Sequence, residues 1–289
     1  APKIQEFFDL PGVSVPHGWA TTSIPIIWGM NWLFDRIPGI NKIDIDMKKM
    51  QDRIGVFGEP IILGLIIGAI IGIIARQDVA GTLKLSMSLA ASMFLFPRMV
   101  SILMEGLVPL TETAHGFFNR RLNGREAYVG LDSALLLGYP GTILVGVLLI
   151  PITLILAAIL PGNTTLPFAD LSATAFFIPM CAPLMRGNLF RSLVTGTVII
   201  AMVLMISSLF APAITLFAAE AGYVLPAEAA GAQYITGLSA GNPVALILYW
   251  IGDLGATVTL GILFVITLAI AATIGIRRNR KERQETLSA

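Results

Sequence analysis

Long apolar runs constrain the fold of this chain more than any other feature of its sequence. A helix needs about 20 residues to cross the hydrocarbon core of a bilayer, and runs of roughly that length cover residues 55–75, 83–104, 141–160, 167–185, 192–219 and 254–276. Only 13% of the residues are charged and 55% are hydrophobic, whereas soluble domains are about one quarter charged. The sequence therefore predicts an all-α polytopic membrane protein with about six or seven transmembrane helices.

Three further apolar stretches are too short or too interrupted to span a bilayer, namely 19–34, 126–140 and 235–251. Asp, Gly, Pro or Asn breaks or flanks each of them, which is typical of broken helices and re-entrant hairpins. The predicted organisation is an N-terminal segment with the short apolar helix 19–34 and a cytoplasmic loop, a transport domain with two hairpins, and a basic tail. These parts cover residues 1–54, 55–276 and 277–289.

The distribution of Lys and Arg predicts a topology, because cytoplasmic loops collect these residues. Several basic residues place the tail 277–289 and the loops 186–191, 105–125 and 41–53 inside. The loops with one basic residue or none, predicted to lie outside, are 76–82, 161–169 and 220–234. This alternation requires 126–140 to enter and leave from the inside, and 235–251 from the outside. Two opposed re-entrant hairpins are a known arrangement in transporters.

The first residues, APKIQEFFDLPG, contain neither an initiator Met nor a signal peptide. We therefore expect a fragment of a longer protein or a processed chain. The predicted architecture is the C-terminal part of a larger inverted-repeat transporter, although no repeat is visible within it. The single cysteine, Cys181, excludes an intrachain disulfide. Its apolar neighbours, FIPMCAPLM, predict a small buried residue rather than a nucleophile, because nothing nearby lowers a thiol pKa.

Acidic residues inside apolar segments indicate function, because charges are costly in a membrane. Asp132 has the strongest case, since it precedes the run LLLG within a stretch containing Gly130, Gly138 and Pro140. A carboxylate there can accept two hydroxyl hydrogen bonds, which suits a sugar or a polyol. Asp132 also suits the N-cap of a helix, and the two roles are compatible.

Glu59 and His17 are the next candidate substrate ligands. Glu59 lies between Gly58 and Pro60 near the start of an apolar run, where it can bind substrate or complement a helix N-terminus. His17 lies in VSVPHGWATTS, where it can donate to a hydroxyl oxygen, relay a proton, or be a satisfied interfacial histidine.

Asn242 completes the predicted substrate ligands, because Asn-Pro in SAGNPVAL suits the turn of the second hairpin. Structural or hinge roles are predicted for three other charged residues. Arg98 either extends its charged end to the inner face or pairs with an acid, Asp170 in LPFADL suits an N-cap, and Asp253 suits a cap or hinge.

Several functional classes have no signature in this chain. No GxxxxGK[ST] motif is present to bind ATP, and the histidines and Cys181 have no metal-ligand spacing. The short basic loops lack the interleaved aromatic residues that indicate nucleic-acid binding. We therefore predict no catalytic residue, metal, cofactor or nucleic-acid partner.

The sequence contains SVPHG, IPGINKI, QDRIGVFGEPIILG, FPRM, GLDSALLLG, PGNTTLPFADL and RGNLFRS, in this order. With these motifs, nearly the whole chain resembles the IIC membrane component of the galactitol family of bacterial sugar phosphotransferase systems. The resemblance implies the ascorbate–galactitol superfamily fold, a homodimer in the cytoplasmic membrane in which a substrate-carrying core moves against a scaffold.

The resemblance also implies a mechanism and partners. The core delivers galactitol or a similar polyol to the cytoplasmic face, where a phosphocysteine on a separate IIB subunit, supplied by IIA, phosphorylates it. Whether the IIC chain counts as an enzyme is left open, since IIB carries the chemistry. Related ascorbate carriers hold their ligand with His, Gln and Asp side chains near hairpins, a pattern that His17 and Asp132 match; Glu59 is added on physical grounds.

Two other functions fit the residues. One is a proton- or sodium-coupled secondary transporter of a small polar solute, with Asp132 and Glu59 as the ion site. The other is a membrane scaffold that carries no solute. The Lys and Arg distribution predicts a multi-pass protein with a cytoplasmic C-terminus, and the resemblance implies that its membrane is the bacterial inner membrane.

Overall fold

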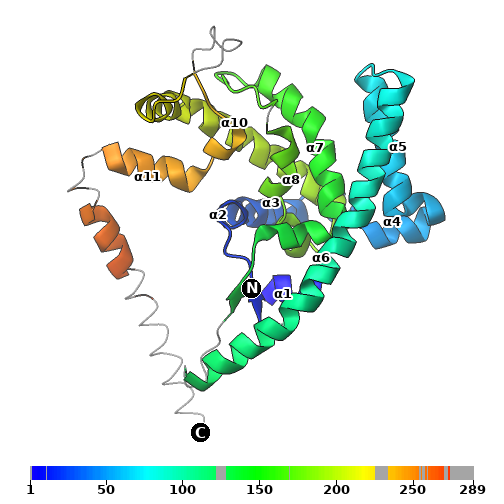
Figure 1. Ribbon diagram of the computed structural model, residues 1–289, viewed down its shortest axis with the longest axis horizontal. Helices are drawn as coiled ribbons and strands as arrows, with labels where there is room; N and C mark the ends of the chain where they lie inside the picture. Colours follow the sequence, from blue (N-terminus) through cyan, green and yellow to red (C-terminus); the bar gives the residue numbers. More distant parts are fainter. Residues whose placement is uncertain are drawn as a thin grey trace. The chain divides into compact units, whose positions relative to one another are not determined.

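A computed structural model describes residues 2–10, 12–121, 128–168, 170–224, 234–253, 255, 258, 260–269 and 273 (Figure 1). Helices dominate, which confirms the predicted helical class; 3-10 helices carry the label η. The elements are α1 (Pro2–Phe8), β1 (Val13–Ser14), α2 (Gly18–Thr22), α3 (Ile24–Arg36), η1 (Ile40–Lys42), α4 (Met47–Ile54), η2 (Gly55–Gly58), α5 (Pro60–Ile74), α6 (Val79–Arg121), β2 (Val129–Gly130), η3 (Ser133–Gly138), α7 (Pro140–Ile159), η4 (Leu171–Ala173), α8 (Thr174–Phe177), α9 (Cys181–Leu184), α10 (Leu189–Glu220), η6 (Leu238–Ala240) and α11 (Pro243–Asp253).

Two compact units divide the chain, residues 1–242 and residues 243–289. The first unit contains every element from α1 to η6. The second contains α11 and the apolar helical stretch Leu260–Ala269. The predicted tail 277–289 lies outside the described residues. The boundary between the predicted N-terminal segment and the predicted transport domain, at residue 54, stays a prediction. Apart from Asp253, the functional residues discussed below belong to the first unit.

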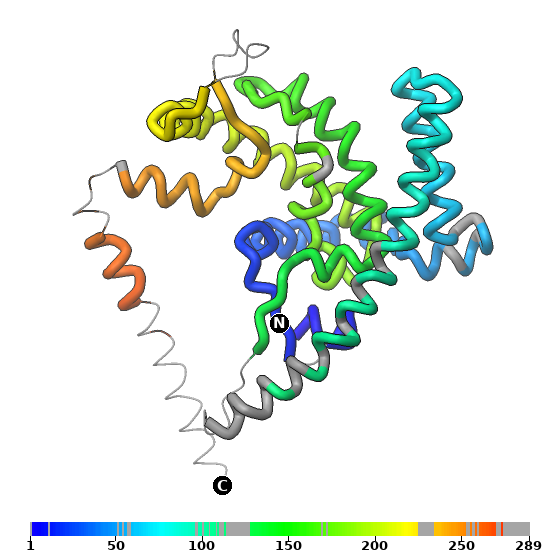
Figure 2. The backbone as a smooth tube through the Cα atoms, in the orientation of Figure 1, coloured from blue at the N-terminus to red at the C-terminus, as the bar shows by residue number. Residues whose placement is uncertain are grey.

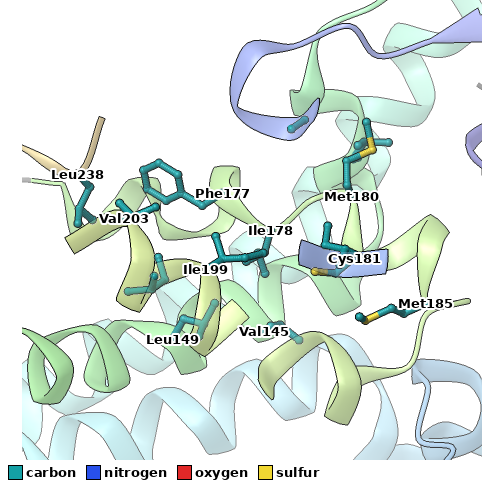
Figure 3. Close-up of a cluster of buried hydrophobic side chains, with 14 of the residues drawn as sticks. Val145, Leu149, Phe177, Ile178, Met180, Cys181, Met185, Ile199, Val203 and Leu238 are labelled. Atoms are coloured by element: carbon teal, nitrogen blue, oxygen red, sulfur yellow. The ribbon is translucent and has the colours of Figure 1, made fainter. Parts of the chain in front are cut away.

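The core of the first unit lies around α7 and α10. Both helices are long and apolar enough to cross a membrane, in agreement with the runs predicted at 141–160 and 192–219. Leu149 of α7 packs with Ile199 and Val203 of α10 in a buried cluster that also contains Phe177 and Cys181 (Figure 3). The cluster confirms that Cys181 is buried, with 1% of its surface exposed.

Polar contacts show that α7 and α10 run parallel. At one end, the Tyr139 hydroxyl donates to the carbonyl oxygen of Gly187, 3.2 Å away. At the other end, the Ser208 hydroxyl donates to Asn163 Oδ1, 2.9 Å away. The two loops that are predicted on opposite sides of the membrane, 186–191 and 161–169, therefore lie at opposite ends of this helix pair.

Helices α5 and α6 form a closely packed antiparallel hairpin (Figure 2). Its contact face on α5 carries a glycine at every fourth position, which places them on one side of the helix: Gly64, Gly68 and Gly72 are all buried. A Cβ atom at Gly68 would lie 2.5 Å from the Cα atom of Ser86 in α6, and one at Gly64 would lie 2.6 Å from that of Ala90. Small residues let helix backbones approach this closely in membrane proteins.

The structure departs from the predicted spans at three places. Helix α5 begins at Pro60, so it is shorter than the run 55–75, whereas α6 extends the run 83–104 to 43 residues. No continuous helix covers 167–185, contrary to the prediction. The chain there forms η4, α8 and α9, and Ile178, which precedes Pro179, has left the helical region with φ −117° and ψ 5°. A residue before proline is disfavoured in the α conformation.

Irregular backbone occupies the described part of the first predicted hairpin and the beginning of the second. Residues 128–140 form β2 and η3, and residues 234–242 form an extended stretch followed by η6. Helix α11, which covers most of 235–251, belongs to the second unit. The re-entrant arrangement of both segments stays a prediction.

Candidate functional site

A short parallel strand pair brings two distant segments of the chain together. Val13 pairs with Val129, and Ser14 pairs with Gly130. The Leu131 amide donates to the carbonyl oxygen of Ser14 at 2.8 Å. Both segments continue beyond their strands in the same direction, so residues 15–17 and 131–133 lie side by side. This pairing, which the sequence pattern did not predict, positions the candidate site.

His17 and Asp132, the two ligands with the strongest sequence case, meet directly beyond the strands. His17 Nε2 lies 3.8 Å from Asp132 Oδ2. The side chain of His17 is 33% exposed and that of Asp132 is 66% exposed, so a ligand from solvent can reach both. We call this pair the His17–Asp132 site.

Each residue is held by its own helix. His17 is the N-cap residue of α2. Its carbonyl oxygen accepts hydrogen bonds from the Thr21 amide at 2.9 Å and from the Thr21 hydroxyl at 2.8 Å. Asp132 caps η3 with its side chain, since Oδ1 accepts from the Ala134 amide at 2.7 Å. The predicted capping role of Asp132 is thus confirmed, and the second carboxylate oxygen faces His17.

Two buried polar atoms without a hydrogen-bond partner lie at the site. Among the described residues, His17 Nδ1, Ser133 Oγ and Thr142 Oγ1 are buried without a hydrogen-bond partner. Buried polar atoms in folded proteins are nearly always paired, so each exception needs an explanation. Two of these three atoms belong to His17 and to the neighbour of Asp132 in the chain.

An apolar cavity of about 370 Å³ adjoins Asp132. Its walls come from α6 and from the start of η3, and they are Met99, Leu103, Leu107, Leu131, Ala134 and Leu135. The cavity is within the size range of small-molecule sites. The site therefore combines a carboxylate and an imidazole with a large apolar surface.

The other two predicted ligands lie elsewhere in the chain. Glu59 is at the N-cap position of α5 and makes no side-chain capping bond. No contact joins Glu59 to His17 or Asp132 in the described part of the chain. Asn242 lies between η6 and α11, at the end of the first unit. Ligand roles for both residues stay predictions.

The three structural candidates have different environments. The guanidinium of Arg98 lies 3.8 Å from the ring centroid of Phe94, one turn earlier on α6. Asp170 makes no capping bond to its own helix, η4. Its Oδ2 instead accepts from the Leu238 amide at 2.7 Å, at the start of η6. Asp253 is the last residue of α11.

A second, strongly polar cavity of about 340 Å³ lies near the start of α10. Sequence reasoning did not assign it a role. We call it the Arg191 cavity, and it is lined by Lys3, Asn31, Asp35, Asn41, Ile43, Asp44, Leu184, Met185, Arg186, Asn188 and Arg191. In the sequence these residues look like ordinary hydrophilic loops and helix ends. The motif RGNLFRS was the one sequence signal for this cavity. It contributes to the family resemblance, but the sequence alone assigned no function to its residues.

Two ionisable groups beside this cavity have shifted pKa values. Burial raises the pKa of the Tyr139 phenol above its usual value, so Tyr139 stays a neutral donor to Gly187. The hydrogen bond to Asp44 raises the pKa of the exposed Lys49 ammonium, which keeps Lys49 positively charged beside that carboxylate. The described residues include no cluster of three or more metal-binding side chains.

Comparisons with known proteins agree with the predicted family. The family model described as PTS system sugar-specific permease component matches residues 1–228. An Escherichia coli K12 protein with the provisional name permease IIC component is 38% identical over 286 residues, which are 99% of this chain and 63% of that protein. The PTS system galactitol-specific EIIC component of the same strain is 37% identical over 244 residues, which are 84% of this chain and 53% of that protein.

This chain thus spans between 53% and 63% of the length of these curated relatives. The galactitol-specific component of E. coli O157:H7 matches to the same extent as that of strain K12. No solved structure matches the chain.

Proposed function

Because this chain belongs to the family of PTS sugar-specific permease components, we propose that it serves as the IIC permease of a sugar phosphotransferase system. Its substrate is galactitol or a similar polyol, which it carries across the inner membrane. The 37% identity to the galactitol-specific component of E. coli supports this substrate class.

The observation that carries the proposal is the meeting of His17 and Asp132 in one accessible site. These side chains come from motifs 115 positions apart, the difference between residues 132 and 17. Asp132 keeps Oδ2 free of backbone bonds while Oδ1 caps η3. A free carboxylate oxygen accepts hydroxyl hydrogen bonds that are about twice as strong as neutral ones.

His17 complements this acceptor with a ring that both donates and accepts. One polyol hydroxyl placed beside both atoms can donate to Asp132 Oδ2 and accept from His17 Nε2. The apolar walls formed by Met99 and Leu103 suit the C–H surface of the carbon chain. Glu59 and Asn242 are proposed as further ligands.

The proposed partners follow from what this chain lacks. Its only cysteine, Cys181, is buried in the core, so it is unsuited to accept a phosphoryl group from another protein. We therefore assign the phosphocysteine to a separate IIB subunit, charged by IIA, and we assign binding and delivery of the polyol to this chain. The functional unit is proposed to be a homodimer.

The proposed membrane topology has the C-terminus in the cytoplasm. The structure supports it at one point: the segments 43–45 and 188–189, both from loops predicted inside, are hydrogen-bonded to each other. The Asn188 side chain donates to the carbonyl oxygen of Ile43 at 2.8 Å, and the Leu189 amide donates to that of Ile45 at 2.6 Å.

Reconstitution tests the function. Vesicles that contain the permease should take up galactitol and accumulate galactitol phosphate when phosphorylated IIA and IIB are supplied inside. Permease alone should accumulate neither form. If permease alone concentrates free galactitol on a proton or sodium gradient, the chain is a secondary transporter and the proposal is wrong.

A further inference from the structure

The Arg191 cavity is built from four parts of the chain. Lys3 comes from α1, Asn31 and Asp35 from α3, Asn41 and Asp44 from η1 and the residues after it, and Arg186 to Arg191 from the turn into α10. Its volume of about 340 Å³ is within the range of sites for small molecules. Both of its loop walls, 41–44 and 186–191, are on the side that the Lys and Arg distribution assigns to the cytoplasm.

The wall beside α10 is rigid. Asn188 is 5% exposed, and its side-chain oxygen accepts from the Arg191 amide at 2.9 Å as the N-cap of α10. Its side-chain nitrogen donates to Ile43 in the facing wall. A cavity whose walls are tied together in this way is preorganised, which lowers the cost of binding a ligand.

Arg191 is held in place and keeps donors available. Its side chain is 12% exposed, and Nη1 donates to Asn31 Oδ1 and to Asp35 Oδ1, each at 2.7 Å. Neither bond uses Nη2 or Nε, and a guanidinium has five N–H donors. A fixed arginine with unused donors is suited to bind a phosphate or carboxylate.

The charges of the cavity do not balance. Asp35 pairs with Arg191, and Asp44 pairs with Lys49. Within the described part of the chain, Lys3 and Arg186 have no carboxylate partner. The start of α10, a helix of 32 residues, adds the positive end of its dipole. The cavity therefore has an excess of positive charge that attracts an anion.

The backbone at Arg186 has an uncommon conformation. Its φ is 54°, and that of Gly187 is 76°. A side-chain-bearing residue is uncommon in this left-handed region and costs conformational energy there. This strained turn holds the exposed Arg186 side chain at the cavity.

We propose that the Arg191 cavity binds the phosphate monoester of a polyol, the product of the proposed permease reaction. The cations Lys3, Arg186 and Arg191 bind the phosphoryl group. The amides of Asn31 and Asn41 bind hydroxyls of the carbon chain. This assignment rests on the proposed function, because that function makes the phosphorylated polyol available on the cytoplasmic side.

Calorimetric titration of the purified permease in detergent tests the proposal. The ligands are galactitol phosphate, galactitol and inorganic phosphate. Arg186→Gln should weaken galactitol phosphate binding by about tenfold or more, because it removes a charge-assisted hydrogen bond. Lys3→Gln should have an effect in the same direction. Asp132→Asn should weaken galactitol binding and leave galactitol phosphate binding unchanged.

Arg76→Gln is the matched control. Arg76 is also an exposed arginine with a φ of 54°, and it lies between α5 and α6, away from the cavity lining. The same backbone strain applies to both substitutions, so Arg76→Gln should leave the affinity for galactitol phosphate unchanged.

Three results would overturn the cavity assignment while leaving the proposed function intact. One is unchanged galactitol phosphate binding in both Arg186→Gln and Lys3→Gln. The second is inorganic phosphate binding as tightly as galactitol phosphate, which would mean an unspecific anion site. The third is an equal loss of galactitol phosphate binding in Arg76→Gln. Wild-type protein that binds neither galactitol nor its phosphate would instead reject the proposed function itself.

Discussion

The irregular segments 128–140 and 234–242 of the first unit contain the same kind of hydrogen bond, which is local in one segment and long-range in the other. In each, a carboxylate accepts from a backbone amide at 2.7 Å at the start of a 3-10 helix. Asp132 caps the helix that directly follows it. Asp170 caps a helix that begins 68 residues later in the chain.

The segments also differ in how completely their polar atoms are paired. Along 234–242, hydroxyls of α10 hold the backbone: Ser207 donates to the carbonyl oxygen of Gly237 at 3.0 Å, and Thr215 accepts from the Ile235 amide at 2.8 Å. Around 128–140, Ser133 Oγ and His17 Nδ1 are buried and unpaired. The backbone of 234–241 is thus the more completely hydrogen-bonded of the two, and the unpaired polar atoms lie where the polyol site is proposed, at 128–140.

Matched glycines test this difference in packing and give the largest expected effect. A Cβ atom at Gly241 would collide with the backbone carbonyl of Val203, whereas one at Gly130 would lie 3.0 Å from the side chain of Pro16. Gly241→Ala should lower the free energy of unfolding by about 2–3 kcal/mol, the cost of overpacking. Gly130→Ala should cost less than about 1 kcal/mol, because a side chain can shift. Denaturant titration in detergent measures both, and equal losses would contradict the assignment of 234–242 as the more tightly packed segment.

Matched acids test the difference in binding. Asp132→Asn should weaken galactitol binding by about 1.5–3 kcal/mol, because it removes a charge-assisted hydrogen bond. Asp170→Asn should leave the affinity unchanged, since the amide oxygen still accepts from Leu238. Calorimetric titration with galactitol measures both. An unchanged affinity in Asp132→Asn would restrict Asp132 to its capping role.

Replacing each of these two acids with alanine should lower the stability of the protein by different amounts. Asp170→Ala leaves the Leu238 amide without its acceptor, and an unpaired amide in the interior costs about 1–3 kcal/mol. Asp132→Ala removes an exposed N-cap, which costs about 1 kcal/mol. A larger loss in Asp132→Ala, measured by denaturant titration, would reverse the roles assigned to the segments.

Two serines give the smallest expected effects. Ser133→Ala removes a hydroxyl that has no partner, so stability should change by less than about 0.5 kcal/mol, while galactitol affinity should fall by about 1 kcal/mol. Ser207→Ala should show the opposite pattern, with a loss of about 1 kcal/mol in stability and none in affinity. If Ser133→Ala instead destabilises the protein without affecting binding, Ser133 belongs to the scaffold.

Part of this arrangement could be predicted from the sequence. The apolar runs gave α7 and α10 correctly, because length and composition decide whether a helix can span a bilayer. His17 and Asp132 could be identified as candidates because a polar residue beside glycines and prolines in an apolar stretch is unusual. Their proximity depends on the β1–β2 pairing, and strands of two residues have no periodicity to detect.

Other features depend on contacts that one sequence does not show. Asp170 is predicted to cap its own helix, because local capping is the usual role of such an acid. It does occupy the N-cap position of η4, but its side chain accepts from the distant Leu238 amide instead. The hydropathy of the run 167–185 predicts one span despite Pro179 and Pro183, but the chain breaks there into η4, α8 and α9. The Arg191 cavity collects residues from four elements, and each of its charges by itself looks like part of a solvated loop.

The most direct test of the central claim is a structure of the permease determined with galactitol bound. We expect polyol density beside His17 and Asp132, with a hydroxyl oxygen within about 3 Å of Asp132 Oδ2 and the carbon chain against the apolar cavity. Galactitol bound along 234–242, with the His17–Asp132 site empty, would contradict this expectation.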